Sequence, residues 1–437
     1  MTLPIPLARH RHRRRLLVLP LVAVAALIAA LFATAGPAAA QGTFAQVTSF
    51  GSNPGNLQMY SYVPSGLPAG APLVVALHGC TQNATDYYDD SGWPKYADLW
   101  DFAVVFPQQQ SSNNSEDCFD WYTPSDYDRG DGEAESIIQM VQYAESSYGV
   151  NPSRIYITGL SAGGGMTDDM LASYPDVFAG GSIDSGLPAD CATSLTNAYT
   201  CEYDSLNDTS AQLGALAKNA DPSYSGPYPR IAIWQGTADT TVAPVNATEE
   251  MDQWTDLWGI SQTASSTQSL TGGTTESIYN DSSGNPAVES YSISGMSHGL
   301  AVEPGSATAD CGTTASYFLN YICSSYYTAL FFGLNSSGSS SPSPTPTPTT
   351  SSPTPTPTPT TPTPTPTPTT PTPTPTPLGC WTTNNYDQVA AGRAYQNLGY
   401  AYADGSNQNM GLWNLYQVTS LEETKAGYYV IVSSCPS

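Results

Sequence analysis

The sequence predicts an α/β domain with a mostly parallel central sheet, followed by a linker and a much smaller second domain. Three observations support this prediction. Apolar runs typical of buried strands alternate with helix-like segments across residues 41–335. Residues 336–377 are almost entirely Ser, Pro and Thr, a composition that cannot bury a core and favours an extended linker. Residues 378–437 return to a globular composition.

Residues 1–40 have the order of a secretory signal peptide. A basic stretch from Arg9 to Arg15 precedes an apolar run, and small residues close the segment at Ala40. Pro20 interrupts the apolar run, which argues against a membrane anchor. We expect cleavage near Gln41 and an extracellular mature protein without a membrane span.

The chain is strongly acidic, with a formal net charge of −25. The expected leader holds five of the twelve Lys and Arg residues and no acidic residue, so the exported part is more acidic still. Such a surface repels nucleic acid and anionic membranes, and we expect neither as a partner. We expect a soluble monomer.

All eight cysteines lie in the exported part, and an even number in an oxidising compartment indicates disulfides. With no CxxC pair and no His/Cys cluster, we expect no metal site. Local spacing favours four pairs: Cys191 with Cys201, Cys311 with Cys323, Cys380 with Cys435, and by elimination Cys80 with Cys118.

The elements of the large domain can be placed in order. Apolar or β-branched runs predict strands at 73–77, 103–106, 154–158, 230–234 and 290–293. A short helix is expected within 86–100, with limits blurred by Gly92 and Pro94. After Asp131, apolar residues recur at three- and four-residue steps, which predicts a helix that ends at Gly149.

A GxSxG pattern, Gly159 to Gly163, joins the strand at 154–158 to a helix-like stretch. In the α/β-hydrolase fold, this strand–turn–helix arrangement lifts a nucleophilic serine to the top of the sheet. Alone the pattern is weak, but its setting favours Ser161 as a nucleophile over a simple Gly/Ser-rich turn. We therefore predict an α/β-hydrolase fold and a serine hydrolase.

A serine nucleophile needs a base, and the mature chain has only two histidines, His78 and His298. His298 lies in a glycine-flanked loop far downstream and is the expected general base. The expected acid is Asp239, which follows the strand at 230–234. Asp184 is its competitor, because it also lies at the end of a strand-like run.

His78 follows the strand at 73–77, where this fold places its oxyanion loop. We expect backbone N–H groups of Cys80 and Ala162 to stabilise the oxyanion. Three aromatic residues are candidates for an acyl or alcohol pocket, although Trp234 fits strand packing equally well. These pocket candidates are Trp121, Tyr122 and Trp234.

Five stretches together resemble the extracellular poly(3-hydroxybutyrate) depolymerase family of esterases, which includes feruloyl and acetylxylan esterases. They are Pro72 to Gln82, Gly159 to Gly164, Tyr174 to Ala179, Gly236 to Asp239 and Met296 to Gly299. The resemblance covers most of the large domain. It implies a triad of Ser161, Asp239 and His298, oxyanion donors at Cys80 and Ala162, and neither a metal nor an organic cofactor.

The tail from Gly379 onward resembles small modules appended to such secreted depolymerases, notably in residues 405–412 and 428–431. It is rich in aromatic residues, which suits either a polymer-binding platform or the core of a small domain. We expect a polymer-binding module in residues 378–437. Its aromatic residues are Trp381, Tyr386, Tyr395, Tyr400, Tyr402, Trp413, Tyr416, Tyr428 and Tyr429.

The expected function is hydrolysis of an ester in an insoluble or polymeric substrate outside the cell, through an acyl-enzyme. Poly(3-hydroxybutyrate) or a similar polyester is the first candidate, and feruloyl or acetyl groups on plant xylan are the alternative. A peptidase is disfavoured because nothing marks a peptide pocket. A binding protein with an inactive hydrolase domain is disfavoured because each required residue type is present.

Overall fold

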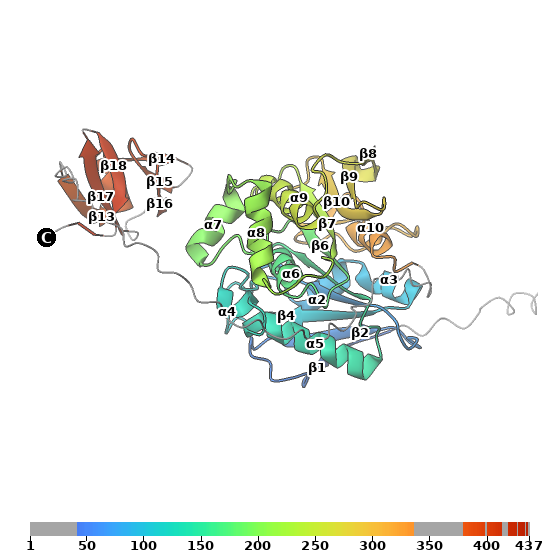
Figure 1. Cartoon of the computed structure of the whole chain (residues 1–437). Coiled ribbons are helices and arrows are strands. Elements are labelled where there is room, and N and C mark those ends of the chain that lie inside the picture. Colours follow the sequence, from blue (N-terminus) through green and yellow to red (C-terminus); the bar gives the residue numbers. More distant parts are fainter. Residues whose placement is uncertain are drawn as a thin grey trace, which may run out of the picture. The chain divides into compact units, whose positions relative to one another are not determined.

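In the computed structural model, the chain divides into two compact units, and the point of division in the sequence falls within the Pro/Thr-rich segment (Figure 1). The expected signal peptide (residues 1–40) and linker (residues 336–377) lie outside the described residues. The structure describes residues 42–335, 379–397, 400–412, 418–425, 427–432 and 434–435.

The first unit is built around a ten-stranded sheet with the order β1-β2-β4-β3-β5-β6-β7-β10-β9-β8. The strands from β4 to β10 in that order are parallel, while β1, β2, β8 and β9 pair antiparallel at the two edges. This is the mixed, largely parallel sheet of the α/β-hydrolase fold, as the sequence predicts. The strands are β1 (Thr43–Val47), β2 (Gln58–Val63), β3 (Leu73–Leu77), β4 (Ala103–Gln108), β5 (Ile155–Leu160), β6 (Gly180–Asp184), β7 (Arg230–Gly236), β8 (Ser266–Ser269), β9 (Thr274–Asn280) and β10 (Pro286–Ile293).

Helices cover both faces of this sheet and bury two separate apolar clusters. One cluster joins the sheet to α5, α6, α7 and α9, and the other joins it to α2, α3 and α10. A second, two-stranded sheet pairs β11 (Leu300–Val302) with β12 (Phe318–Asn320). The helices are α2 (Ala84–Asp90), α3 (Trp93–Trp100), α4 (Pro124–Tyr127), α5 (Gly132–Tyr148), α6 (Ala162–Ser173), α7 (Leu195–Tyr203), α8 (Ser210–Ala220), α9 (Val245–Trp258), α10 (Ser324–Phe331) and the single 3-10 turn η1 (Thr271–Gly273).

The elements expected from apolar patterns are present. The strand predicted at 73–77 is β3, and the helix predicted after Asp131 is α5, which ends at Gly149 with φ of 67°. The single helix expected within 86–100 is two helices, α2 and α3. Gly92 separates them with φ of 84°, and a Cβ atom there would lie 2.5 Å from the Cβ of Cys311. The chain therefore turns at a glycine that packs too closely for any other residue.

The four expected disulfides are all present. Cys80 is bonded to Cys118, Cys191 to Cys201, Cys311 to Cys323, and Cys380 to Cys435. Within the described ranges, no helix combines the length and apolarity needed to cross a bilayer.

The second unit is a small β module whose sheets have three strands each, in the orders β13-β17-β18 and β14-β15-β16. Its core contains Ala394, Ala401, Ala403, Met410 and Leu421. The disulfide from Cys380 on the first strand to Cys435, which follows the last strand, supplements this small apolar core. The elements are β13 (Gly379–Asn384), α11 (Asn385–Ala390), β14 (Ala394–Asn397), β15 (Tyr400–Ala403), β16 (Asn409–Leu412), β17 (Val418–Lys425) and β18 (Tyr428–Val432).

Candidate active site

Ser161 lies on a strained turn between β5 and α6. Its φ and ψ are 58° and −121°, a conformation that is costly for a residue with a side chain and that recurs at functional sites. Its backbone N–H donates to the carbonyl of Asp184 at 2.9 Å, which ties the turn to the end of β6. The turn holds Ser161 at the amino end of α6, as expected for a nucleophile in this fold.

The flanking glycines are required by close backbone contacts. A Cβ atom on Gly159 would lie 2.1 Å from the carbonyl oxygen of Gly163, and one on Gly163 would lie 2.4 Å from that of His78. The loop after β3, residues 78–82, therefore packs directly on the serine turn. We refer to these five residues as the β3 loop.

His298 and Asp239 are in direct contact. The Nδ1 atom of His298 lies 2.8 Å from Oδ2 of Asp239, which also accepts from the Gln235 side chain at 3.1 Å. The other carboxylate oxygen accepts the backbone N–H groups of Thr241 and Val242, at 2.9 and 3.0 Å. A carboxylate that accepts a hydrogen bond from Nδ1–H fixes the tautomer in which Nε2 carries no proton and can act as a base.

Strand order explains why these distant residues meet. Asp239 follows β7 and His298 follows β10. These strands are parallel neighbours, so both loops leave the sheet at one edge, the one formed by the carboxyl ends of the parallel strands. Ser161 follows β5 in the same parallel set and so reaches that edge too. The Ser185 hydroxyl donates to the Gly299 carbonyl at 3.2 Å, which links the end of β6 to the histidine loop, residues 295–299.

The described residues include no hydrogen bond between the Ser161 hydroxyl and His298. In unliganded hydrolases this bond is often long and tightens when substrate binds. The pairing of the two side chains therefore stays a prediction, supported by the shared edge.

The His78 ring forms its hydrogen bonds with backbone groups. Its side chain is fully buried, Nε2 accepts the backbone N–H of Gln109 at 3.1 Å, and Nδ1 lies 2.8 Å from the Gly79 carbonyl. Burial lowers the pKa of His78 to about 4, so the ring is neutral at pH 7. Both ring nitrogens form hydrogen bonds, so His78 cannot receive a proton from a serine without losing one of these bonds.

A buried polar network braces the β3 loop from behind. The Gln109 side chain donates to the Cys118 carbonyl at 3.0 Å and to the carboxyl group of Glu133. Glu133 also accepts the backbone N–H of Asp120 at 3.0 Å, and burial raises its pKa to about 8. The disulfide from Cys80 to Cys118 links this network covalently to the β3 loop.

Gln82 is a residue of the site that sequence reasoning did not single out. Its Oε1 accepts the Gly79 N–H at 2.8 Å, and only 6% of the residue is exposed. Its Nε2 is buried and has no hydrogen-bond partner among the described residues. The spacing of three residues between Gly79 and Gln82 was the available signal, since it lets a side chain reach back to the turn.

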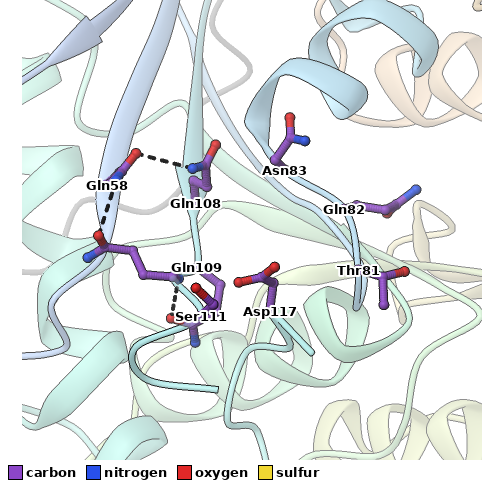
Figure 2. A pocket seen from close by; sticks show the side chains of 9 residues that line it. Gln58, Thr81, Gln82, Asn83, Gln108, Gln109, Ser111 and Asp117 are labelled. Atoms are coloured by element: carbon purple, nitrogen blue, oxygen red, sulfur yellow. Dashed lines mark hydrogen bonds between the residues drawn. The ribbon is translucent and has the colours of Figure 1, made fainter. Parts of the chain in front are cut away.

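A polar cavity of about 240 Å³ opens beside the β3 loop (Figure 2). Side-chain amides dominate its lining, and hydrogen bonds link Gln58 to Gln108 and Gln110. The lining residues are Gln58, Thr81, Gln82, Asn83, Gln108, Gln109, Gln110, Ser111 and Asp117.

The aromatic pocket candidates occupy two different places. Trp121 is buried near Gly165 on α6 and contacts the half-buried Tyr122 edge to face, with ring centroids 5.5 Å apart. Trp234 instead lies in the core, stacked on Tyr291 at 3.8 Å. Of the two roles expected for Trp234, its position favours strand packing over pocket lining, because the ring packs among α10 and β10 on the face of the sheet that α2, α3 and α10 cover.

Asp184, the competitor for the acid, does not contact His298. Its carboxylate accepts from the hydroxyls of Thr158 and Ser182, at 3.1 and 3.3 Å. Burial raises the pKa of Asp184 to about 7. Its backbone carbonyl holds the serine turn, so its role here is structural.

Comparison with known proteins places the chain in a family. Residues 57–279 match the family model described as esterase PHB depolymerase. Poly(3-hydroxyalkanoate) depolymerase C from Paucimonas lemoignei is 50% identical over 290 residues, which cover 66% of this chain and 70% of that protein. The chain belongs to the PHB depolymerase family of esterases. The resemblance seen in the sequence is thus confirmed.

As a PHB depolymerase family esterase, the chain is a serine-type carboxylic-ester hydrolase. Feruloyl esterase B from Talaromyces funiculosus is 36% identical over 269 residues, 60% of this family member and 74% of that protein. The solved acetyl xylan esterase from Aspergillus awamori is 29% identical, with a TM-score of 0.57 over 67% of this esterase and 100% of that chain. This likeness agrees with the α/β-hydrolase architecture.

Proposed function

We propose that this esterase hydrolyses the ester bonds of a polyester, poly(3-hydroxybutyrate) or a close relative, outside the cell. The observation that carries the proposal is the 2.8 Å contact of His298 with Asp239, at the sheet edge that also bears Ser161 on its strained turn. That edge supplies a nucleophile, a base and an acid in the roles that ester hydrolysis needs.

In the first half-reaction, the Ser161 oxygen attacks the ester carbonyl while Nε2 of His298 takes the hydroxyl proton. Asp239 stabilises the imidazolium through Nδ1. The backbone N–H groups of Ala162 and Cys80 are the proposed donors to the oxyanion. Ala162 is the first residue of α6, and such N–H groups have no partner within their own helix.

Collapse of the tetrahedral intermediate breaks the bond to the alkoxy oxygen, which leaves as an alcohol after taking the proton from His298. Water then attacks the acyl-enzyme, with His298 again accepting a proton. The second collapse releases the carboxylic acid and returns the proton to Ser161. One ester and one water thus become one alcohol and one acid.

Three features favour a polymeric substrate and an extracellular site of action. The relative with 50% identity is named as a poly(3-hydroxyalkanoate) depolymerase. The four disulfides suit an oxidising compartment. The Pro/Thr-rich segment joins the esterase to a separate small module, an arrangement that lets one part adsorb while the other reacts.

We assign polymer binding to the small module. In residues 379–435, the described rings include two tyrosines on neighbouring strands, Tyr395 and Tyr402, which stack with centroids 5.5 Å apart. Tyr395 is 40% exposed, so one side of this pair faces solvent. An exposed aromatic pair offers apolar area to an insoluble polymer at low entropic cost.

Hydrolysis of feruloyl or acetyl groups on xylan is the second candidate. It is favoured by the cavity beside the β3 loop, because its amide side chains suit the hydroxyl groups of a sugar (Figure 2). The named feruloyl and acetylxylan esterases among the relatives support it as well.

A substrate panel tests both candidates. The secreted protein is incubated with poly(3-hydroxybutyrate) film, feruloylated xylan and acetylated xylan, and the released 3-hydroxybutyrate, ferulate and acetate are measured. Erosion of the film at least tenfold faster than release from either xylan supports the proposal, and the opposite ratio overturns it. Ser161→Ala is the control, and it should abolish release from every substrate.

A further inference from the structure

Helix α7 exposes large apolar side chains on one face. Leu195, Tyr199 and Tyr203 are 52%, 48% and 45% exposed. They are spaced by four residues, so they line one side of the helix. The rings of Tyr199 and Tyr203 are nearly parallel, with an interplanar angle of 9°.

This exposure is unusual within the molecule. Within residues 42–335, the large apolar side chains that are clearly exposed number five, and α7 contributes three of them. The other two are Leu99 on α3 and Tyr317, whose ring lies 6.1 Å from that of His298. The buried side of α7 carries only the small residues Ala198 and Cys201. The helix thus directs its large side chains to solvent and its small ones to the core.

α7 is rigidly held despite its length of nine residues. The disulfide from Cys191 to Cys201 ties the helix to the segment before it. The Ser194 side chain caps its first turn, and the Tyr127 hydroxyl donates to Asp190 just upstream at 2.8 Å. The apolar face is therefore fixed in place before any partner arrives.

α7 also lies at the active-site edge of the sheet. It follows β6, in the connection that leaves the same strand ends as the catalytic loops. The backbone N–H of Ala243 donates to the carbonyl of Glu202 at 2.7 Å, and Ala243 lies four residues after Asp239. Figure 1 shows α7 at the periphery of the esterase unit, beside α8.

The exposed face of α7 is uncharged, although the chain carries a formal charge of −25. The single ionisable carboxyl group of the helix belongs to Glu202, which is partly buried, and burial raises its pKa to about 7. A neutral apolar stripe on an acidic protein complements a neutral apolar partner and does not suit an ionic one.

We propose that α7 is an adsorption surface through which the esterase domain itself docks onto an uncharged, apolar polyester, using Leu195, Tyr199 and Tyr203. The inference rests on the proposed function and identifies how the catalytic edge is brought against a solid substrate. It adds a contact on the esterase unit to the one assigned to the C-terminal module.

The test uses the full-length protein with the triple change Leu195→Ser, Tyr199→Ser and Tyr203→Ser. Leu99→Ser is the matched control, because Leu99 is 50% exposed on a helix outside this edge. We expect the triple variant to hydrolyse a soluble nitrophenyl butyrate at the wild-type rate within twofold, and to erode polyester film at least tenfold more slowly. Leu99→Ser should match the wild type in both assays.

One further variant, a double change, separates the explanations. Tyr199→Phe combined with Tyr203→Phe keeps the rings and should retain film erosion, whereas loss would indicate hydroxyl contacts and contradict apolar adsorption. Unchanged film erosion by the triple variant, or an equal loss on film and soluble ester, would also overturn the proposal. So would a concentration-dependent dimer that the triple change dissociates, since α7 would then face a second copy.

Adsorption without turnover distinguishes this inference from the proposed function. Ser161→Ala protein, with and without the triple change, is mixed with polyester particles, and the bound fraction is measured. A several-fold weaker adsorption of the triple variant supports the α7 surface even if the wild type proves inactive on polyester, a result that would end the proposed function alone. Equal adsorption of Ser161→Ala protein with and without the triple change would show that α7 is not an adsorption surface.

Discussion

The β3 loop and the histidine loop lie at the same edge of the sheet and each contains one histidine, yet the two imidazoles have opposite surroundings. His78 is buried, neutral and bonded to the backbone through both nitrogens. His298 commits one nitrogen to Asp239. The comparison teaches that the first loop uses its histidine to hold backbone groups in place, while the second leaves Nε2 of its histidine available for the proton transfer proposed above.

The largest effect should come from the histidine loop. Asp239→Asn preserves shape but can donate to Nδ1 and so favours the wrong imidazole tautomer, and we expect kcat on a soluble nitrophenyl ester to fall by about 10⁴-fold. The melting temperature should change little. A fall of less than tenfold would show that another carboxylate orients His298 and would break the comparison.

The next largest effect should follow from loss of the disulfide that holds the β3 loop. Cys80→Ser combined with Cys118→Ser removes the brace and should lower kcat by about tenfold to a hundredfold, because small displacements of oxyanion donors are costly. Cys311→Ser combined with Cys323→Ser is the control, since that disulfide joins elements near α3 and α10. If both pairs of changes reduce kcat equally, general destabilisation and not the loop explains the loss.

The two histidines can be compared directly. His298→Asn should lower kcat by about 10⁴-fold, like loss of a triad member. His78→Asn leaves the Gln109 N–H without its acceptor, so we expect a loss of about 1–3 kcal/mol in unfolding free energy and less than a tenfold fall in kcat. Urea unfolding and steady-state kinetics on both variants provide the measurement, and equal kinetic losses would contradict the distinction.

The smallest effect concerns pH. Burial raises the pKa of Glu133 to about 8 from an ordinary value of 4.5, so the folded chain holds this proton more tightly than the unfolded chain does. The resulting stabilisation is complete below about pH 4.5 and is lost as the pH rises through 8. Glu133→Gln should therefore flatten the decline of melting temperature between pH 5 and pH 8, by about 2–4 °C. If the dependence of melting temperature on pH is the same in Glu133→Gln as in the wild type, Glu133 is not the group whose proton is lost over this range.

Strongly patterned elements were predictable from the sequence, because burial on both faces leaves continuous apolar runs. β3 and α5 match their predicted ranges, and the scarcity of histidine led to His298. The strands β1, β8 and β9 lie near the two ends of the sheet and are rich in polar residues, and β1 and β8 are largely exposed. No apolar run therefore indicated them in the sequence.

Other features depend on contacts between distant segments and have no local signal. The choice between Asp239 and Asp184 follows from which loop reaches His298, which strand order decides. The burial of Trp234 depends on stacking with Tyr291 of the neighbouring strand. The exposed face of α7 has an ordinary helical spacing, and only the fold shows which side meets solvent.

The crowding around Ser161 restricts how this enzyme can be altered to accept other acyl groups. Gly159 and Gly163 face carbonyl oxygens at distances that exclude even a methyl group, and a Cβ atom on Gly165 would lie 3.0 Å from the ring of Trp121. Libraries that vary the serine turn would therefore yield mostly misfolded protein. Directed evolution of substrate range is better aimed at positions such as Tyr122 and Tyr317, where half-exposed rings leave room for exchange.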